Sequence, residues 1–375
     1  MVNRNLKYQQ KLVQRLFKTF LQGNMMKGYV WVLLLAMTSM ECVAGFDEGA
    51  AAYEAKDYTT AFREFLPLAN DGDAKSQAKL GLMYDNGEGV AQNYGKAVLW
   101  YRKAAAQDNA DAQYYLGLMY YKGNGVAQDI SQAAHFFRKA AEQGNPSAQF
   151  YLGLMYIKAD GVSKDYSQAA SLFRKAAEQG DNHSQHLLGL MYDNGEGVAQ
   201  NYGKAVLWYR KAAEQGNADS QYALGLMYYN GEGVAQDYSQ AADLYRKAAE
   251  QGNSSALNNL GNMYRNGEGV AQNYRKSADL YRKAAEQGHS NALNNLGVTY
   301  EVGLGVGKNL VLAHIFYNLA AVNGDTKVKN NRDEITPQLT SAQLSEAQEL
   351  ASKWVKGQPL PTLSKTYPSS SHKKK

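Results

Sequence analysis

The chain has 375 residues, a single cysteine and a formal net charge of +5. Residues 1–44 contain six basic residues and one acidic residue, so the rest of the chain carries 34 charges of each sign and lacks the basic surface that binds nucleic acid. Because the cysteine is Cys42, the chain beyond it can form no disulfide and has no cysteine nucleophile.

Residues 25–44 have the pattern of a secretory signal peptide. Lys27 precedes an apolar run of about ten residues, and small residues follow at the two positions that a signal peptidase reads, Cys42 and Ala44. We expect cleavage after Ala44, with residues 1–24 as an N-terminal extension, and a periplasmic or secreted mature chain. The run is shorter than the roughly 20 residues that span a bilayer, so no membrane span is expected after cleavage. An uncleaved N-terminal anchor is the alternative.

One motif recurs every 36 residues along most of the chain. Its most regular mark is a glycine, found at Gly81, Gly117, Gly153, Gly189, Gly225, Gly261 and Gly297. A fixed period of this size is typical of supersecondary units that stack on their neighbours. We predict seven full units, at 74–109, 110–145, 146–181, 182–217, 218–253, 254–289 and 290–325. A shortened first repeat at 46–73 precedes them, as expected of a terminal repeat that shields the end of the core.

Each unit contains start and stop signals for two helices, here named helix A and helix B. An Asp or Asn precedes helix A in the first six units and helix B in all seven, as at Asp73 and Asn93, and its side chain can accept from the first free backbone N–H groups. Helix A ends at a Gly-x-Gly loop such as Gly87 and Gly89, and helix B ends at a glycine such as Gly144. The predicted fold is all-α, a right-handed superhelical solenoid of 36-residue helix-turn-helix repeats.

The spacing of apolar residues predicts which helix faces are buried. Positions i, i+4, i+7 and i+8 share one side of a helix, and in the first full unit these are Ser76, Leu80, Met83 and Tyr84. We expect them to pack against helix B. The helix B residues expected in this core are Ala97, Leu99, Trp100, Tyr101, Ala104 and Ala105. Gly81 lies beside the seam, where it would let a neighbouring helix approach closely.

The period stops after residue 325. Residues 326–356 are predicted to form C-terminal capping helices, with a turn at Pro337 and an amphipathic helix from about Ser341 that carries Leu344 and Ala347 on its apolar side. The Pro, Ser and Lys content from Gly357 onward predicts a disordered tail over 357–375.

The repeated unit reads Ala-x-x-x-Leu-Gly-x-Met-Tyr-x-x-Gly-x-Gly-Val-x-x-Asp-x-x-x-Ala-x-x-x-Tyr-x-Lys-Ala-Ala-Glu-Gln-Gly and resembles the Sel1-like repeat, an α/α relative of the tetratricopeptide repeat. The resemblance covers Phe46 to Asp325. Two units depart from the pattern, one with Ala159 in place of the first loop glycine and one with Thr299 in place of methionine. These two units are expected to be geometrically irregular. The resemblance implies a superhelix that holds other proteins or peptides, in bacteria often in the periplasm or in contact with a host.

The residues capable of chemistry form no recognisable catalytic or metal site. None of the six histidines recurs at a shared position of the repeat, and the pair His183 and His186 lacks a third ligand. The Gly-x-Gly loops follow helices and lack the context of a phosphate-binding loop. We therefore expect no catalytic residue, no metal and no cofactor, and a chain that is not an enzyme.

The informative positions are those that vary while their neighbours repeat. On helix A these lie opposite the seam and are expected to line the concave side, aromatic and aliphatic in the units that begin at 110, 146 and 218 and polar in those that begin at 254 and 290. The predicted partner-binding residues are Tyr114, Leu118, Tyr121, Phe150, Leu154, Ile157, His186, Tyr222, Leu226, Tyr229, Asn258 and Arg265. For the leucines, packing of helix A against helix A is an equal alternative, whereas for the aromatic residues ligand contact is favoured.

The leading hypothesis is a scaffold or adaptor that binds a protein or peptide along the concave helix A face and catalyses no reaction. The alternatives are a cell-envelope enzyme or peptidoglycan-processing accessory, and an effector directed at a host cell.

Overall fold

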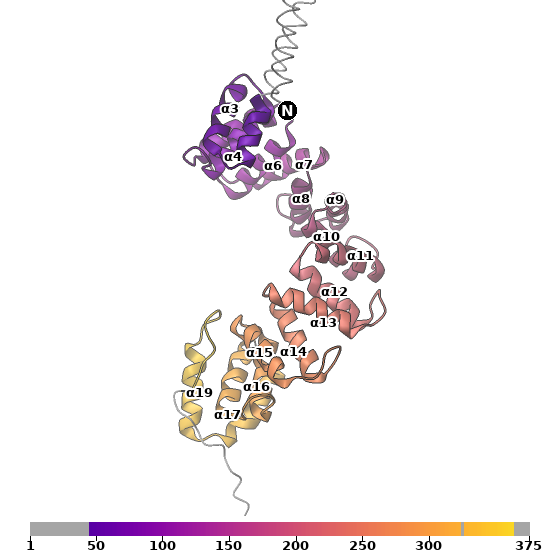
Figure 1. Cartoon of the computed structure of the whole chain (residues 1–375), viewed down its shortest axis with the longest axis vertical. Coiled ribbons are helices and arrows are strands. Elements are labelled where there is room, and N and C mark those ends of the chain that lie inside the picture. The colour runs from indigo at the N-terminus through magenta and orange to yellow at the C-terminus, as the bar shows by residue number, and fades with distance from the viewer. Residues whose placement is uncertain (1–44, 324–325, 364–375) are drawn as a thin grey trace, which may run out of the picture. The chain divides into compact units, whose positions relative to one another are not determined.

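The computed structural model describes residues 45–323 and 326–363 (Figure 1). The chain divides into two compact units, Met1–Phe136 and Phe137–Lys375, and the division falls inside a helix. Every regular element in the described residues is an α-helix or a short 3₁₀ helix, which confirms the all-α fold class. None of these helices is both long and apolar enough to cross a bilayer. The predicted signal peptide lies outside the described residues.

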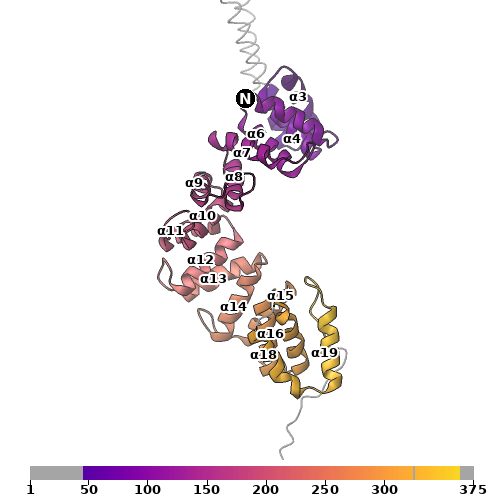
Figure 2. The same ribbon diagram turned by 180° about the vertical axis from the view of Figure 1, so that it is seen from behind.

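The helices follow one another as pairs in chain order (Figures 1 and 2). Residues 45–54 are helical and are followed by α3 (Tyr58–Asn70). The A helices are α4 (Ala74–Asn86), α6 (Ala110–Lys122), α8 (Pro146–Lys158), α10 (Asn182–Asn194), α12 (Ala218–Asn230), α14 (Ser254–Asn266) and α16 (Ser290–Val302). The B helices are α5 (Tyr94–Ala105), α7 (Ile130–Glu142), α9 (Tyr166–Glu178), α11 (Tyr202–Glu214), α13 (Tyr238–Glu250), α15 (Tyr274–Glu286) and α17 (Leu310–Ala320).

Within each unit, consecutive helices pack on one another. In the first unit α3, α4, α5 and α6 pack in sequence, and in the second unit the same holds from α8 to α17. Within a unit, a B helix such as α5 or α11 therefore lies between the A helix of its own repeat and that of the next, which is the stacking of a solenoid.

Side-chain caps start the helices at the predicted positions. Asp73 accepts a hydrogen bond from the backbone N–H of Ser76 at 2.6 Å, and Asn93 accepts from Lys96 at 2.9 Å. The equivalent Asp and Asn residues cap the later A helices up to α14 and the later B helices up to α17. The caps predicted from the sequence are therefore confirmed.

The predicted seam on helix A is buried. Ser76, Leu80 and Met83 are 0% exposed and Tyr84 is 8% exposed. The repeated glycine beside them makes room for the aromatic ring of helix B, because a Cβ added at Gly189 would lie 2.6 Å from the ring of Tyr209. The prediction of a close approach at this glycine is therefore confirmed, and the neighbour is the helix B ring of the same repeat.

Helix B differs from the prediction at one position. Leu99 is 58% exposed and its equivalent Leu207 is 50% exposed, so the prediction that Leu99 joins the core is wrong. The other predicted positions agree: Ala97, Tyr101, Ala104 and Ala105 are buried and Trp100 packs at the edge of the core, and Val98 is buried in addition. Because successive residues rotate by about 100° around a helix, a side chain between the buried positions 97 and 101 can still point outward.

The two repeats that depart from the motif are regular, contrary to expectation. Ala159 adopts the left-handed conformation (φ 58°), and its N–H caps α8 by donating to Met155, as the loop glycines do elsewhere. Thr299 is 3% exposed, and its hydroxyl donates to the carbonyl of Asn295 at 2.7 Å. The tertiary contacts of neighbouring repeats thus impose the same backbone on a less suitable residue.

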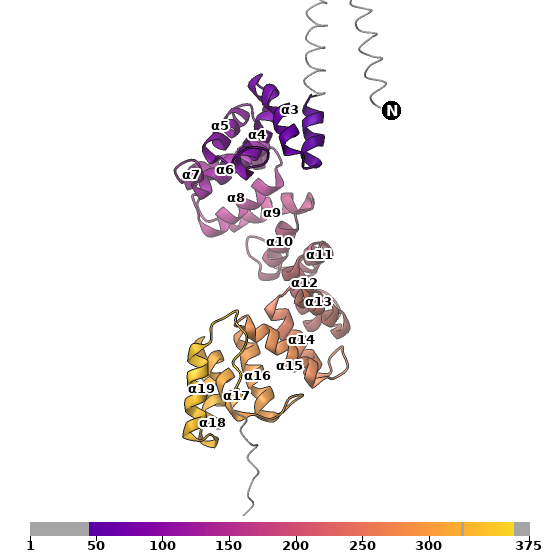
Figure 3. The same cartoon turned by 60° about the vertical axis from the view of Figure 1, so that its left-hand side comes forward.

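The C-terminal end is covered by two helices, α18 (Thr326–Ile335) and α19 (Ser341–Lys353), and both pack on α17. Pro337 lies in a 3₁₀ turn between them, as predicted. Residues 357–363 are described and Leu360 among them is 9% exposed, so the prediction of a disordered tail is wrong for this segment (Figure 3). Residues 364–375 lie outside the described residues.

Candidate binding surface

The helix A face, as used below, consists of three positions in each A helix that lie opposite the seam. In the second unit its residues are Phe150, Leu154, Ile157, His186, Leu190, Asp193, Tyr222, Leu226, Tyr229, Asn258, Asn262, Arg265, Asn294, Val298 and Glu301. Most of these side chains are half-buried, Leu190 is 37% exposed and Asn258 is 5% exposed. The face is thus partly supported by the protein and partly open to solvent.

Three consecutive repeats carry a ring on this face that rests on the core ring of helix B in the same repeat. Phe150 lies 6.1 Å from Phe173, His186 lies 5.7 Å from Tyr209, and Tyr222 lies 5.8 Å from Tyr245, measured between ring centroids. The core rings themselves are fully buried. A half-exposed ring that packs on a buried one has few orientations open to it, so it loses little conformational entropy when a ligand covers it.

His186 also connects two repeats. Its Nδ1 lies 2.8 Å from the hydroxyl of Ser220 on α12, which is the next helix A. Burial lowers the pKa of His186, and the nearby Asp219 opposes this shift only in part. The imidazole is therefore neutral at neutral pH, where it presents an apolar ring with one polar edge.

The face changes to carboxamides in α14 and α16. Asn295 donates to Asn258 at 2.9 Å and to Asn262 at 3.3 Å, so one side chain bridges two turns of the preceding A helix. Asn258 in turn donates to Asn259 at 3.1 Å, and the hydroxyl of Tyr281 donates to Asn262 at 2.7 Å. Of the predicted binding residues, Asn258 therefore forms the base of this network.

The same bonding continues onto the capping helices. Asn331 of α18 donates to Asn294 of α16 at 3.0 Å, and Arg332 donates to Asn318 of α17 at 3.2 Å. Carboxamide groups thus tie the last two A helices and the first capping helix together.

The third position of the face lies near the hydroxyl of the core tyrosine or near the next loop. The hydroxyl of Tyr209 donates to Asp193 at 3.3 Å, and that of Tyr317 donates to Glu301 at 2.6 Å. Burial raises the pKa of Asp193 despite this bond. Tyr229 instead donates to Glu268 in the loop of the following repeat at 3.0 Å. These side chains are fixed by bonds within the chain before any partner arrives.

The first unit has its own part of the helix A face on α4 and α6. Ala78 is 8% exposed, whereas Tyr114, Leu118 and Tyr121 are half-buried. The ring of Tyr114 lies 5.1 Å from that of Tyr115. Tyr115 stacks at 5.3 Å on Tyr101, the core ring of helix B.

Two features of this region were missed in the sequence. The column that contains Tyr115, Tyr151, Asn259 and Asn295 also varies from repeat to repeat, and its members contact the face residues or the core rings. Its variation was visible in the 36-residue alignment. The contacts of these residues could not be predicted from the sequence, because contact across repeats depends on how the helices pack.

The second missed feature is a series of buried glutamines that ties successive repeats together. The Nε2 of Gln185 donates to the carbonyl of Ala177 at 3.1 Å, and Gln215 donates to Gln185 at 2.8 Å. The same bonds recur at Gln221, which is contacted by Gln251. At the equivalent positions α14 and α16 have Leu257 and Leu293, whose side chains are buried and apolar.

Within the part of the chain that the structure describes, no group of three His, Cys, Asp or Glu side chains is arranged to hold a metal ion. The helix A face itself presents aromatic rings and carboxamides.

Comparison with known proteins matches this architecture. The sequence model of the Sel1 repeat matches residues 74–109, 110–145, 146–181, 182–217, 218–253, 254–289 and 290–325. No curated protein matches the chain.

Two solved structures are similar over most of their length. The first is c5321, a protective antigen of uropathogenic Escherichia coli strains that displays an SLR fold. It shares 30% identity, with 90% of this chain and 99% of that chain covered and a TM-score of 0.52. The second is a Sel1 repeat protein from Oxalobacter formigenes with 34% identity, which covers 64% of this chain and 96% of its own length with a TM-score of 0.57.

Proposed function

Because the chain belongs to the Sel1 repeat family, whose solenoids are generally protein-interaction scaffolds, we propose that it binds a protein or peptide partner on its helix A face. The observation that carries the proposal is the set of half-exposed rings at Phe150, His186 and Tyr222, each resting on a buried ring of helix B. Aromatic side chains held in one orientation are typical anchors of protein interfaces.

The carboxamides of the C-terminal repeats add a polar part to this proposed interface. Asn262 and Asn295 are half-buried. The Oδ1 of Asn262 and the Nδ2 of Asn295 each take part in two bonds of the network, so the donor offered to a partner is the Nδ2 of Asn262 and the acceptor is the Oδ1 of Asn295. A partner that places apolar side chains on the rings and backbone amides on the asparagines would satisfy both parts. An extended peptide or an exposed loop has this composition.

Site-specific photo-crosslinking in the full-length chain tests the proposal. A benzophenone amino acid replaces Phe150 or Tyr222 in two variants, and Leu207 in a control variant, because Leu207 is 50% exposed on helix B. We expect covalent adducts with a discrete partner at Phe150 and Tyr222 and none of the same mass at Leu207. Adducts confined to Leu207, or equal at all three positions, would remove the helix A face from consideration.

We also propose that the chain is exported, on the basis of Lys27 and the Cys42-to-Ala44 sequence alone. Fractionation of cells that express a C-terminally tagged chain, followed by N-terminal sequencing, tests this. Export predicts a periplasmic or secreted product that begins at Gly45. A cytoplasmic product that retains residues 1–44 would contradict it.

A further inference from the structure

A helix B groove, as used below, lies over a helix A, between the helix B of the same repeat and the helix B of the preceding repeat. The last such groove of the solenoid, over α16 between α15 and α17, is occupied by the chain itself. After α19, residues 354–363 have no regular secondary structure, and Gly357 donates its N–H to the carbonyl of Glu286 at the end of α15 at 2.8 Å. Leu360 is 9% exposed and Leu363 packs on the same core. This segment has the sequence Pro-Leu-Pro-Thr-Leu over residues 359–363. An extended apolar peptide therefore lies along the surface formed by α15, α16 and α17.

The repeat residues that line the cavity beside this segment have equivalents in the other repeats. A cavity of about 420 Å³ is bordered by Arg282, Tyr300 and Phe316 on one side and by residues 359–363 on the other. Arg282, Tyr300 and Phe316 stand at three positions that recur every 36 residues, so each earlier repeat presents its own version of the groove.

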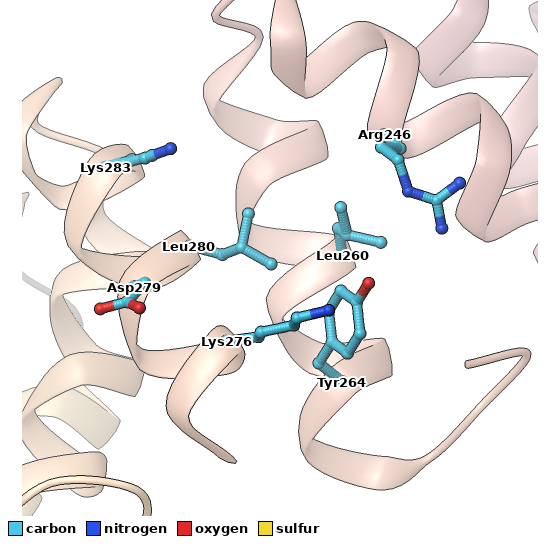
Figure 4. Close-up of a pocket in the computed structure, with 7 residues that line it drawn as sticks. All are labelled: Arg246, Leu260, Tyr264, Lys276, Asp279, Leu280 and Lys283. Carbon is cyan, nitrogen blue, oxygen red and sulfur yellow. The ribbon is translucent and has the colours of Figure 1, made fainter. Parts of the chain in front are cut away.

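One repeat earlier, the equivalent groove is open. A cavity of about 360 Å³ lies between α13, α14 and α15 and is lined by Arg246, Tyr264 and Leu280, which correspond in order to Arg282, Tyr300 and Phe316. Leu260 lies beside Leu280 in its floor (Figure 4). Its lining comes from the three helices alone, without a C-terminal segment.

Comparison with another repeat explains why this groove has space. At the position of Leu280, the groove between α9 and α11 carries Trp208, whose side chain is 8% exposed and covered by Lys211 at 4.3 Å from the ring centroid. Arg174 there donates to Tyr192 at 3.0 Å. In the open groove the smaller leucine leaves room.

The arginine of the open groove has two partners within the chain. Arg246 forms an ion pair with Asp243 on its own helix, with its Nη1 at 2.5 Å from Oδ1. Its guanidinium also interacts with the hydroxyl of Tyr264, as Arg174 does with Tyr192, so the open groove differs from the groove between α9 and α11 in having no indole.

The charge of the open groove differs from that of the occupied one. Lys276 and Lys283 stand where the occupied groove has Leu312 and Leu319, and both lysines are exposed. Lys276 lies 5.3 Å from the ring of Tyr264, at the edge of the cavity, and Arg246 lies on the opposite side from Lys283 (Figure 4). Against these three cations the lining contains one carboxylate, Asp279. An occupant that carries its own carboxylates would be favoured.

We propose that the groove between α13 and α15 binds an extended segment of a partner protein that combines leucine and proline with flanking carboxylates. Its apolar side chains fill the space above Leu260 and Leu280, as Leu360 does one repeat later. Its carboxylates meet Arg246, Lys276 and Lys283. This site lies on the helix B side and does not depend on the helix A face.

Fluorescence polarisation with a labelled peptide tests the proposal. The probe is Glu-Pro-Leu-Pro-Thr-Leu-Asp-Glu, which places the apolar sequence of residues 359–363 between carboxylates, and the protein is the full-length chain. We expect saturable binding that weakens with added salt. Leu280→Trp should weaken it about tenfold or more by filling the groove. The double change Lys276→Gln and Lys283→Gln should weaken it and reduce its dependence on salt.

The controls separate this site from the proposed function. Leu280→Trp introduces a residue that two other repeats carry at this position, Trp100 and Trp208, so folding should be retained and is checked by circular dichroism. Tyr222→Ser on the helix A face should leave probe affinity unchanged. A probe with both leucines replaced by serine should not bind. Absence of saturable binding to the native chain, or equal affinity for the Leu280→Trp variant, would overturn the proposal.

Discussion

The helix A face of the second unit has two parts that share one scaffold and differ in how they are held. In α8, α10 and α12 its rings rest on helix B of the same repeat, and buried glutamines such as Gln185 tie the repeats together beneath them. In α14 and α16 leucines replace those glutamines, and the link between repeats is made on the face itself by Asn258 and Asn295. The polar link between repeats thus lies beneath the face in the aromatic part and on the face itself in the asparagine part.

Disruption of the packing of helix A on helix B, which is common to both parts, should lower the free energy of unfolding most. Gly189→Ala places a methyl group 2.6 Å from the ring of Tyr209, and overpacking of this kind costs about 2 to 3 kcal/mol. We expect chemical denaturation to report that loss of unfolding free energy. Gly203→Ala in α11 is the matched control, because its nearest neighbour outside the local backbone is the side chain of Asn201 at 3.4 Å. A Gly189→Ala variant as stable as the control would contradict the close packing of helix A on helix B.

Removal of the glutamine link should cause the second largest loss of unfolding free energy, and this loss should be specific to the aromatic part. Gln185→Ala deletes the bonds to Ala177 and Gln215 and leaves buried partners unpaired, at a cost of about 2 kcal/mol. Gln185→Leu should cost less than half of that, because Leu257 and Leu293 fill the equivalent sites in the other part. Equal destabilisation by the two changes, measured in urea, would mean that the distinction between the two parts is wrong.

The asparagine network should contribute about 1 kcal/mol, and its effect should be cooperative. Asn295→Ala removes two bonds, and a double-mutant cycle with Asn258→Ala should give a coupling free energy of about 1 kcal/mol. The comparison pair is Phe150→Ala and Tyr222→Ala in the aromatic part. These residues lie two repeats apart, so we expect near-additive effects. Additive behaviour of the asparagine pair would show that the carboxamides are not linked.

The smallest effect should be a pH dependence of stability to which buried histidines of both parts contribute. Burial lowers the pKa of His186, of His289 and of His314, so the unfolded chain takes up protons at higher pH than the folded one. Their stabilisation is therefore complete above the ordinary histidine pKa of about 6.5 and is lost as pH falls below it.

Thermal melts between pH 7 and pH 5.5 check this prediction. His289→Asn should flatten the dependence without loss of the α16 cap, because Asn253 caps α14 in the same position. His186→Gln should flatten it further. A melting temperature with the same slope in the native chain and in both variants would contradict the assignment of the pH dependence to these histidines.

Local sequence signals predicted much of this structure. Asp and Asn caps, loop glycines and the Leu, Met and Tyr seam depend on backbone geometry within one repeat, and each was found where the sequence placed it. The exposure of Leu99 agrees with helical spacing, because it lies two residues from both Ala97 and Tyr101 and so on the opposite side of the helix; its apolar character led to the wrong prediction.

Contacts between repeats were the least predictable. The glutamine link, the asparagine network and the burial of Leu360 all join residues 30 or more positions apart. The period aligns such residues, but which of them touch depends on the angle between successive helices. For the candidate site, the sequence indicated which positions vary. The packing of their rings on the rings of helix B became visible only in the structure.

The most direct test of recognition by the helix A face is the affinity of the crosslinked partner for two variants of equal thermal stability. One carries Phe150→Ser and Tyr222→Ser on the face, and the other carries Leu207→Ser on exposed helix B. We predict that the first variant binds about tenfold or more weakly and that the second matches the native chain. Equal affinity of both variants would contradict a binding role for the helix A face.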